Sequence, residues 1–465
     1  MKFSDAKKEE KMRKNYLTTT RIIALGFLVT IIVGTILLSL PISVNQGEHA
    51  DWMTAAFTST TSVCVTGLVV VDTFSYWSLF GKCVILILIQ IGGLGFVSIM
   101  TLFMLLLRKK MTLKNTMLLQ DAFNLNSKQG LLKFAVKVIK GTIFIEVFGA
   151  LLYSFYFCRR FGFLKGVWFS VFHSVSAFCN AGIDILGPDS LIKYQSNPGI
   201  LLTTAFLIIM GGIGFIVWWD VVEAAKKMRY QHTEIKSVWN GMHLQTKIAV
   251  VTTLFLLLTG TVLIFVLERK NTETIGGFST GDKILNSFFQ AVTFRTAGFA
   301  SFSQKALRPA TALLGIVFML IGGSPVGTAG GMKTVTIAVI FFTFVAMIRN
   351  HDETEVFHRS IPVTVVKKAV AILFLFLNTI LLMTILLLAT NDVNLIDGIY
   401  EVTSAVCTVG LSRDLTASLN TIGKILIILC MYIGRVGPIS MVVAFNTQTG
   451  KHRLLHYPEE HVIVG

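Results

Sequence analysis

The chain has 465 residues, of which 53% are hydrophobic and only 14% charged, and its mean hydropathy of +0.71 excludes a soluble globular domain. Its net charge of +16 could indicate a nucleic-acid-binding protein, but the whole excess lies in four segments that alternate with long apolar blocks, at 1–21, 108–140, 226–247 and 349–368. Basic residues confined to alternate connections are typical of a multi-pass membrane protein with those connections in the cytoplasm. We therefore expect a plasma-membrane protein with cytoplasmic N- and C-termini and no nucleic-acid partner.

Eight apolar blocks approach or exceed the ~20 residues that a helix needs to cross the bilayer. In chain order they cover 22–40, 83–107, 134–157, 200–219, 248–267, 313–348, 365–389 and 422–445, and the sixth is interrupted at 322–331. The first block follows basic residues, as a signal peptide does, but it is long and no small-x-small cleavage site follows it. We expect it to be a retained helix.

A short amphipathic stretch follows the first, third, fifth and seventh of these blocks, and none of these stretches is long enough to cross a bilayer. They cover 51–62, 166–177, 282–293 and 395–405, and we interpret them as half-helices. The predicted fold is an all-α polytopic membrane protein of four helix, re-entrant pore loop, helix repeats around a central pore, with eight transmembrane helices plus four half-helices. The predicted boundaries are a cytoplasmic tail at 1–21, repeat 1 at 22–107, a cytoplasmic linker at 108–133, repeat 2 at 134–231, a linker at 232–247, repeat 3 at 248–349, a linker at 350–364, repeat 4 at 365–445 and a cytoplasmic tail at 446–465.

One motif closes all four half-helices: an apolar residue, a Cys or Arg, two variable residues, a Gly and a large apolar residue. The four copies are Val63-Cys64-Val65-Thr66-Gly67, Phe178-Cys179-Asn180-Ala181-Gly182, Phe294-Arg295-Thr296-Ala297-Gly298 and Val406-Cys407-Thr408-Val409-Gly410. Irregular backbone cannot face lipid, so the four loops are expected to line a shared polar interior. Glycine permits dihedrals that turn carbonyl groups inward, where they can replace the hydration shell of a cation. A lone membrane glycine more often serves helix packing, and we interpret the pairs at 92–93 and 211–212 in that way.

The second span of the third repeat contains a segment that a regular helix cannot accommodate. It reads Gly322-Gly323-Ser324-Pro325-Val326-Gly327-Thr328-Ala329-Gly330-Gly331 and leads into Met332-Lys333-Thr334. A phosphate-binding loop requires Lys directly after Gly, and here Met332 intervenes. Unwound backbone at membrane depth should line a cavity, so we expect a movable gate below the glycine loops.

Several charged residues are candidates for a role in ion movement. Arg435 lies in the middle of the last span and is expected to be functional, with pairing to Glu146, to Glu401 or to loop carbonyls as the alternative. Arg295 is expected to brace its own loop. The acids that follow the glycine segments, Asp72, Asp184 and Asp414, could concentrate cations at a pore mouth or be ordinary loop carboxylates.

These motifs, together with Gly434-Arg435-Val436-Gly437-Pro438, resemble the Trk/Ktr/HKT superfamily of cation transporters, and most of all the membrane subunit of bacterial Ktr-type potassium uptake systems. The resemblance covers nearly the whole chain. It implies that Gly67, Gly182, Gly298 and Gly410 are filter glycines that hold a potassium ion through the backbone, and that 322–331 and Arg435 form the gate. In this superfamily a Ser at the first filter glycine is associated with sodium transport, so Gly67 favours potassium.

The resemblance also implies a homodimer with one pore per protomer, a cytosolic ring of nucleotide-binding regulatory (RCK-type) subunits, and potassium uptake that sodium stimulates, with no covalent cofactor and sodium as a possible coupling ion. The alternatives are a sodium-selective or poorly selective transporter of the same fold, a membrane-embedded enzyme that binds a phosphate at 322–331, and a non-transporting receptor or scaffold. An enzyme is not expected, because the spans offer no paired general acid and base.

Overall fold

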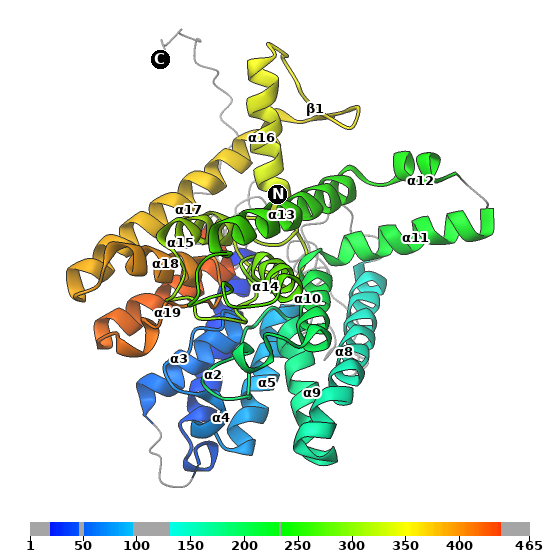
Figure 1. Ribbon diagram of the computed structural model, residues 1–465. Helices are drawn as coiled ribbons and strands as arrows, with labels where there is room; N and C mark the ends of the chain where they lie inside the picture. The colour runs from blue at the N-terminus through cyan, green and yellow to red at the C-terminus, as the bar shows by residue number, and fades with distance from the viewer. Residues whose placement is uncertain (1–18, 46–50, 96–130, 232–233, 439–465) are drawn as a thin grey trace, which may run out of the picture.

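The computed structural model describes residues 19–45, 51–95, 131–231 and 234–438. The expected N-terminal tail up to residue 18, the end of the second span after residue 95, most of the first linker and the chain after residue 438 lie outside the described residues. In Figure 1 the chain winds around a common centre, from α2 and α3 through α8 and α9 and then α13 to α15, and ends at α17 to α19.

Long apolar helices form the outer frame. The helices α2 (Thr19–Leu38), α13 (Leu244–Glu268) and α17 (Val363–Thr390) are long and apolar enough to cross a membrane. The pair α10 (Pro198–Gly212) and α11 (Phe215–Gln231) counts as a fourth span if its bend is ignored. The frame also contains α8 (Leu131–Phe161), and α17 leaves Phe374 and Leu381 more than 60% exposed. Such apolar faces suit contact with lipid.

Shorter helices and one hairpin fill the rest. They are α4 (Thr73–Tyr76), α5 (Leu79–Leu94), α12 (Ile235–Gly241), α15 (Pro309–Leu320), α16 (Thr334–Ile348), α19 (Thr421–Val436), the 3-10 turns η1 (Pro41–Ser43), η2 (Ile192–Tyr194) and η3 (Thr416–Ser418), and the antiparallel strands β1 (Thr354–Val356) and β2 (Arg359–Ile361). The hairpin and α12 lie within segments expected only as linkers.

Four short helices precede the four glycine segments and lie inside the frame. They are α3 (Trp52–Cys64), α9 (Phe163–Phe178), α14 (Thr280–Thr293) and α18 (Leu395–Val406). Asp51 caps α3 by accepting a hydrogen bond from the Thr54 N–H at 3.0 Å, and Ser279 caps α14 in the same way through Asp282. Each helix then ends either at the residue just before its glycine motif or at the first or second residue of that motif. Capping side chains therefore mark the start of α3 and α14, and the glycine motifs mark the end of all four helices.

The second span of the second repeat is not continuous, although its apolar block at 200–219 suggested one helix. The chain bends by 98° between α10 and α11. Gly214 adopts a φ of +96° at the bend, and the Phe215 N–H donates to the Val326 carbonyl at 2.8 Å. Gly95 (φ +81°) and Gly437 (φ +90°) end α5 and α19 with the same left-handed backbone. A glycine thus follows the end of α5, α10 and α19 at a corresponding position.

Candidate functional site: a ring of glycine loops

The four motif glycines lie against one another in a closed ring. A Cβ atom placed on Gly67 would lie 2.6 Å from the carbonyl oxygen of Ala181. The same construction on Gly182 reaches the Ala297 oxygen at 2.7 Å, and that on Gly298 reaches the Val409 oxygen at 2.7 Å. Gly410 closes the circle, because its Cβ would overlap the carbonyl oxygen of Thr66. Only glycine fits at these four positions.

The backbone of the loops has the same conformation in all four copies. Two residues before each glycine the chain adopts a left-handed φ between 51° and 64°, at Val65, Asn180, Thr296 and Thr408. The residue in between has an ordinary negative φ, so the sign of φ alternates along the loop. Left-handed backbone is costly for β-branched residues such as Val65, by roughly 1–3 kcal/mol. Its presence in all four copies indicates a conformation held in place for function.

Hydrogen bonds to the short helices hold the loops from behind. The N–H of Thr66 donates to the Thr61 carbonyl at 2.9 Å, and the equivalent N–H groups of Ala181, Ala297 and Val409 donate to their own helices at 2.7–3.1 Å. Hydroxyl groups add further bonds: Gly67 N–H donates to Thr61 Oγ1 at 2.9 Å and Gly410 N–H to Ser404 Oγ at 3.0 Å. Within the described residues, the carbonyl oxygens of Thr66, Ala181, Ala297 and Val409 accept no hydrogen bond.

The hydroxyl side chains behind the loops were not predicted from the sequence. Ser176 Oγ donates to the carbonyl of Ile183, and Thr293 Oγ1 donates to that of Phe299 at 2.7 Å. With Thr61 and Ser404, they place a hydroxyl five or six residues before every motif glycine. That spacing is the signal that could have found them.

All twenty residues of the four motifs are buried, and the structure brings their glycines together. Further glycines, among them the pairs interpreted as packing positions, lie directly beside the four motifs. A Cβ on Gly92 would overlap the Val63 carbonyl, one on Gly211 the Phe178 carbonyl and one on Gly434 the Val406 carbonyl. The second spans therefore approach the first carbonyl of three loops as closely as backbone allows.

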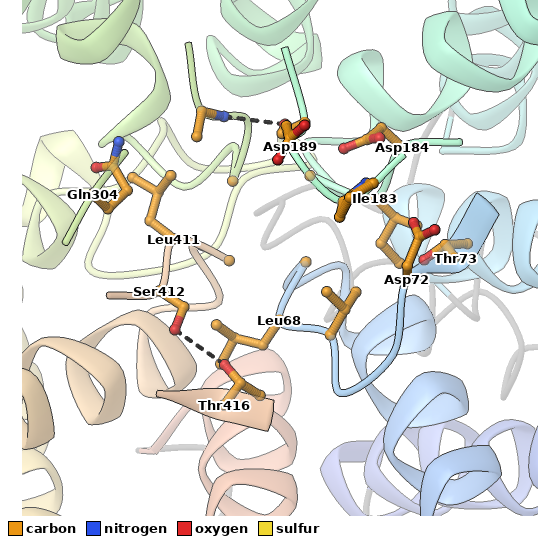
Figure 2. Close-up of a pocket in the computed structure, with 18 of the residues that line it drawn as sticks. Leu68, Asp72, Thr73, Ile183, Asp184, Asp189, Gln304, Leu411, Ser412 and Thr416 are labelled. Carbon is orange, nitrogen blue, oxygen red and sulfur yellow. Dashed lines mark hydrogen bonds between the residues drawn. The ribbon is translucent and has the colours of Figure 1, made fainter. Parts of the chain in front are cut away.

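A cavity of about 500 Å³ opens above the ring on the side that follows the glycines. Its lining includes all four glycines and the side chains of Asp72, Asp184, Asp189 and Asp414. Figure 2 shows Asp72, Asp184 and Asp189 along one side, with Gln304, Ser412 and Thr416 across from them. Asp189 was not among the acids expected here. The cavity is thus an acidic vestibule.

The Asp184 carboxyl lies in the loop between α9 and α10, outside the spanning helices. Burial of this side chain raises its pKa to about 6, although the Leu186 N–H and Ser190 donate hydrogen bonds that lower it. The neighbouring carboxylates of Asp72 and Asp189 add to the rise. Asp184 therefore changes its charge close to neutral pH.

Below the ring, residues 322–331 form no regular helix and cross directly beneath two of the loops. Thr328 Oγ1 donates to the Phe178 carbonyl at 3.0 Å, and the Gly330 N–H donates to Thr296 Oγ1 at 3.2 Å. The Ser324 and Thr328 N–H groups donate to the carbonyls of Gly212 and Gly211 at 2.7 and 3.0 Å. The segment is therefore bonded both to the ring and to the break in the second repeat.

Arg435 extends from α19 to this segment. Its Nη1 donates to the Thr328 carbonyl at 2.8 Å, and its Nη2 donates to the Gly92 carbonyl. Glu146 and Glu401, the acids considered as partners, are bonded elsewhere: Glu146 accepts from Gln90, and Glu401 accepts from Ser412 and Thr416. The partners of Arg435 are thus backbone carbonyls, one in the 322–331 segment and one near the end of α5.

The fold and the site define a multi-pass membrane protein in which four loops bring backbone carbonyl groups together in a closed ring, an arrangement typical of cation transporters. The family of TrkH cation transport proteins matches residues 3–457. The chain belongs to this family. The family is one of transporters, so the chain is not an enzyme.

Individual proteins agree with this assignment. The chain is 37% identical over 462 residues to the potassium/sodium uptake protein NtpJ of Enterococcus hirae, covering 98% of this chain and 99% of that protein. It is 38% identical over 448 residues to the Ktr system potassium uptake protein B of Bacillus subtilis, covering 96% and 97%. The crystal structure of the potassium transporter TrkH from Vibrio parahaemolyticus matches with a TM-score of 0.69 at 16% identity, covering 90% of this chain and 84% of that one. The expected resemblance to Ktr-type membrane subunits and the all-α membrane fold are confirmed.

Proposed function

We propose that this chain carries potassium ions into the cell across the plasma membrane, through a selectivity filter made by the main chain of the four glycine loops. The observation that carries the proposal is the closed ring, in which each glycine lies against the unbonded carbonyl of the next loop. Carbonyl oxygens in a ring can replace the water around a monovalent cation. The short helices add the negative ends of their dipoles, since their C-termini lead into the ring.

In this proposal the architecture has four repeats and eight spans, with the gate formed by residues 322–331 and Arg435. The segment crosses beneath the ring, and a fixed guanidinium holds it there. A cation at this level meets an obstruction and a like charge in surroundings of low dielectric constant, where repulsion is far stronger than in water.

We further propose that a separate cytosolic ring of nucleotide-binding RCK-type subunits controls the gate, that sodium stimulates uptake as a coupling ion, and that the chain forms a homodimer with one pore per protomer. The name of the Bacillus subtilis relative, a Ktr system protein, supports a multi-component system.

A second candidate is a sodium-selective or poorly selective transporter of the same fold. The name of the Enterococcus hirae relative, a potassium/sodium uptake protein, favours it. The first ring position argues against this candidate, because Gly67 has no side chain to narrow the passage.

Rescue of a bacterium that lacks potassium uptake separates the two candidates. We expect the chain, expressed alone or with a regulatory subunit, to restore growth at low external potassium without raising sodium uptake. Sodium uptake equal to potassium uptake would favour the second candidate.

A further inference from the structure

Arg295 has an unusual position for a charged side chain. It belongs to the third glycine motif, and its side chain is buried, with 7% exposed. Its Nη2 donates to Thr253 Oγ1 at 3.3 Å and to the Gly322 carbonyl at 3.4 Å, while its Nε has no hydrogen-bond partner among the described residues. Nor does any carboxylate in the described part of the chain form an ion pair with it. A cavity of only about 10 Å³, lined in part by Asn180 and Gly323, lies beside it.

Such an arrangement does not suit a purely structural role. A buried cation without an acid partner is costly, and apolar side chains of similar volume often fill such a site at lower free energy. Both of its hydrogen bonds are longer than the 2.7–3.2 Å typical of N–H donors, so the guanidinium is held weakly. A weak polar contact suits a link that breaks and forms again during function.

We propose that Arg295 is a positioning residue that couples the gate to the filter, an inference that rests on the filter and gate of the proposed function. Its main chain is part of the ring, and its side chain contacts Gly322, the first residue of the gate. Arg435 holds the gate at Thr328, but it stands on α19, outside the ring. Movement of the gate at Gly322 therefore reaches the third filter loop through Arg295.

The test compares two quantities in proteoliposomes: basal rubidium uptake, which reports on the gate, and the ratio of rubidium to sodium uptake, which reports on the filter. A residue in the gate alone raises the first quantity and leaves the second unchanged, whereas a residue in the filter alone lowers the second and does not raise the first. We expect Arg295→Gln to change both, with uptake rising about fivefold, which corresponds to about 1 kcal/mol, and the ratio falling about threefold, which corresponds to about 0.6 kcal/mol.

Three variants calibrate the comparison. Gly67→Ser should lower the ratio without raising basal uptake, and Arg435→Gln should raise uptake without lowering the ratio. Arg269→Gln makes the same substitution as Arg295→Gln at an exposed position in the same repeat and should change neither quantity. If Gly67→Ser and Arg435→Gln both behave as wild type, the proposed function fails.

If those two variants behave as expected and Arg295→Gln changes only one quantity or neither, the coupling is overturned and the proposed function stands. Arg295→Lys covers the case in which Arg295→Gln does not fold. Lysine keeps the charge and most of the reach, so it should stay within about twofold of wild type in both quantities. A well-folded Arg295→Lys protein would contradict the proposal if its basal uptake or its uptake ratio changed as much as is expected for Arg295→Gln.

Discussion

The four ring glycines combine a left-handed φ with the backbone of a neighbouring ring loop within 3 Å of where a Cβ would lie. Gly67 combines a left-handed φ of +104° with a carbonyl only 2.6 Å from where its Cβ would be. A side chain at this position is strained and also displaces the neighbouring loop. Selectivity should therefore respond to this residue before stability does.

We predict that Gly67→Ser lowers the preference for potassium over sodium by about tenfold, or about 1.4 kcal/mol. Competition of potassium and sodium with rubidium uptake measures this preference. Gly277→Ser is the matched control, because Gly277 is exposed and a Cβ there meets nothing within 4 Å. An unchanged preference in a folded Gly67→Ser protein would remove Gly67 from the filter.

A second residue-scale prediction concerns external pH. The pKa of Asp184 is about 6, so this carboxyl is neutral below that pH and charged above it. As external pH falls through this value, the vestibule loses one negative charge and attracts cations less strongly. The apparent affinity for rubidium should fall accordingly.

Asp184→Asn removes this charge at every pH, so its affinity should be low already at high pH and should change less as pH falls. Asp189→Asn is the comparison: Asp189 lines the same cavity but is exposed and forms an ion pair with Lys193 at 3.3 Å, so this variant should keep the pH dependence and move it to lower pH, because the Asp189 carboxylate raises the pKa of Asp184. An equally steep pH dependence in Asp184→Asn would assign the effect to another group.

At the scale of elements, the proposed gate, residues 322–331, can be tested by deleting part of it. Removing residues 325–328 deletes the Thr328 bonds to Phe178 and Arg435 while leaving both flanking helices intact. We predict that this deletion raises basal rubidium uptake into proteoliposomes several-fold, and that Arg435→Gln raises it less because the segment still obstructs the path. Wild-type uptake by a well-folded deletion protein would mean that the glycine-rich segment serves packing.

Short helices lie where the sequence showed short amphipathic stretches, because a glycine motif ends each of them. The sequence also predicted that residues 322–331 form no regular helix, and the structure shows none between α15 and α16. The bend after α10 could not be read from the sequence. The bend combines the left-handed φ of Gly214 with a hydrogen bond between Phe215 and Val326, more than a hundred residues apart, and no local pattern reveals that bond. The left-handed φ of Val65 was hidden for a similar reason, because neighbouring loops rather than local propensity impose it.

At the scale of the whole molecule, two of the basic connections lie side by side. The rings of Trp239 and Phe357 meet edge to face at 6.1 Å, and Arg359 Nη2 donates to the Asn240 carbonyl at 3.4 Å. Figure 1 shows α12 and the hairpin of β1 projecting beyond the body of the helices. The connections at 226–247 and 349–368 therefore share one face, as alternating spans require.

The central claim is that the glycine ring passes potassium in preference to sodium. Rubidium uptake by the purified chain in proteoliposomes, measured with potassium or sodium as the competing ion, tests it most directly. We predict that potassium suppresses rubidium uptake at concentrations at least about tenfold lower than sodium does, a difference of about 1.4 kcal/mol. Equal suppression by the two ions, or no uptake by a folded protein, would contradict the account.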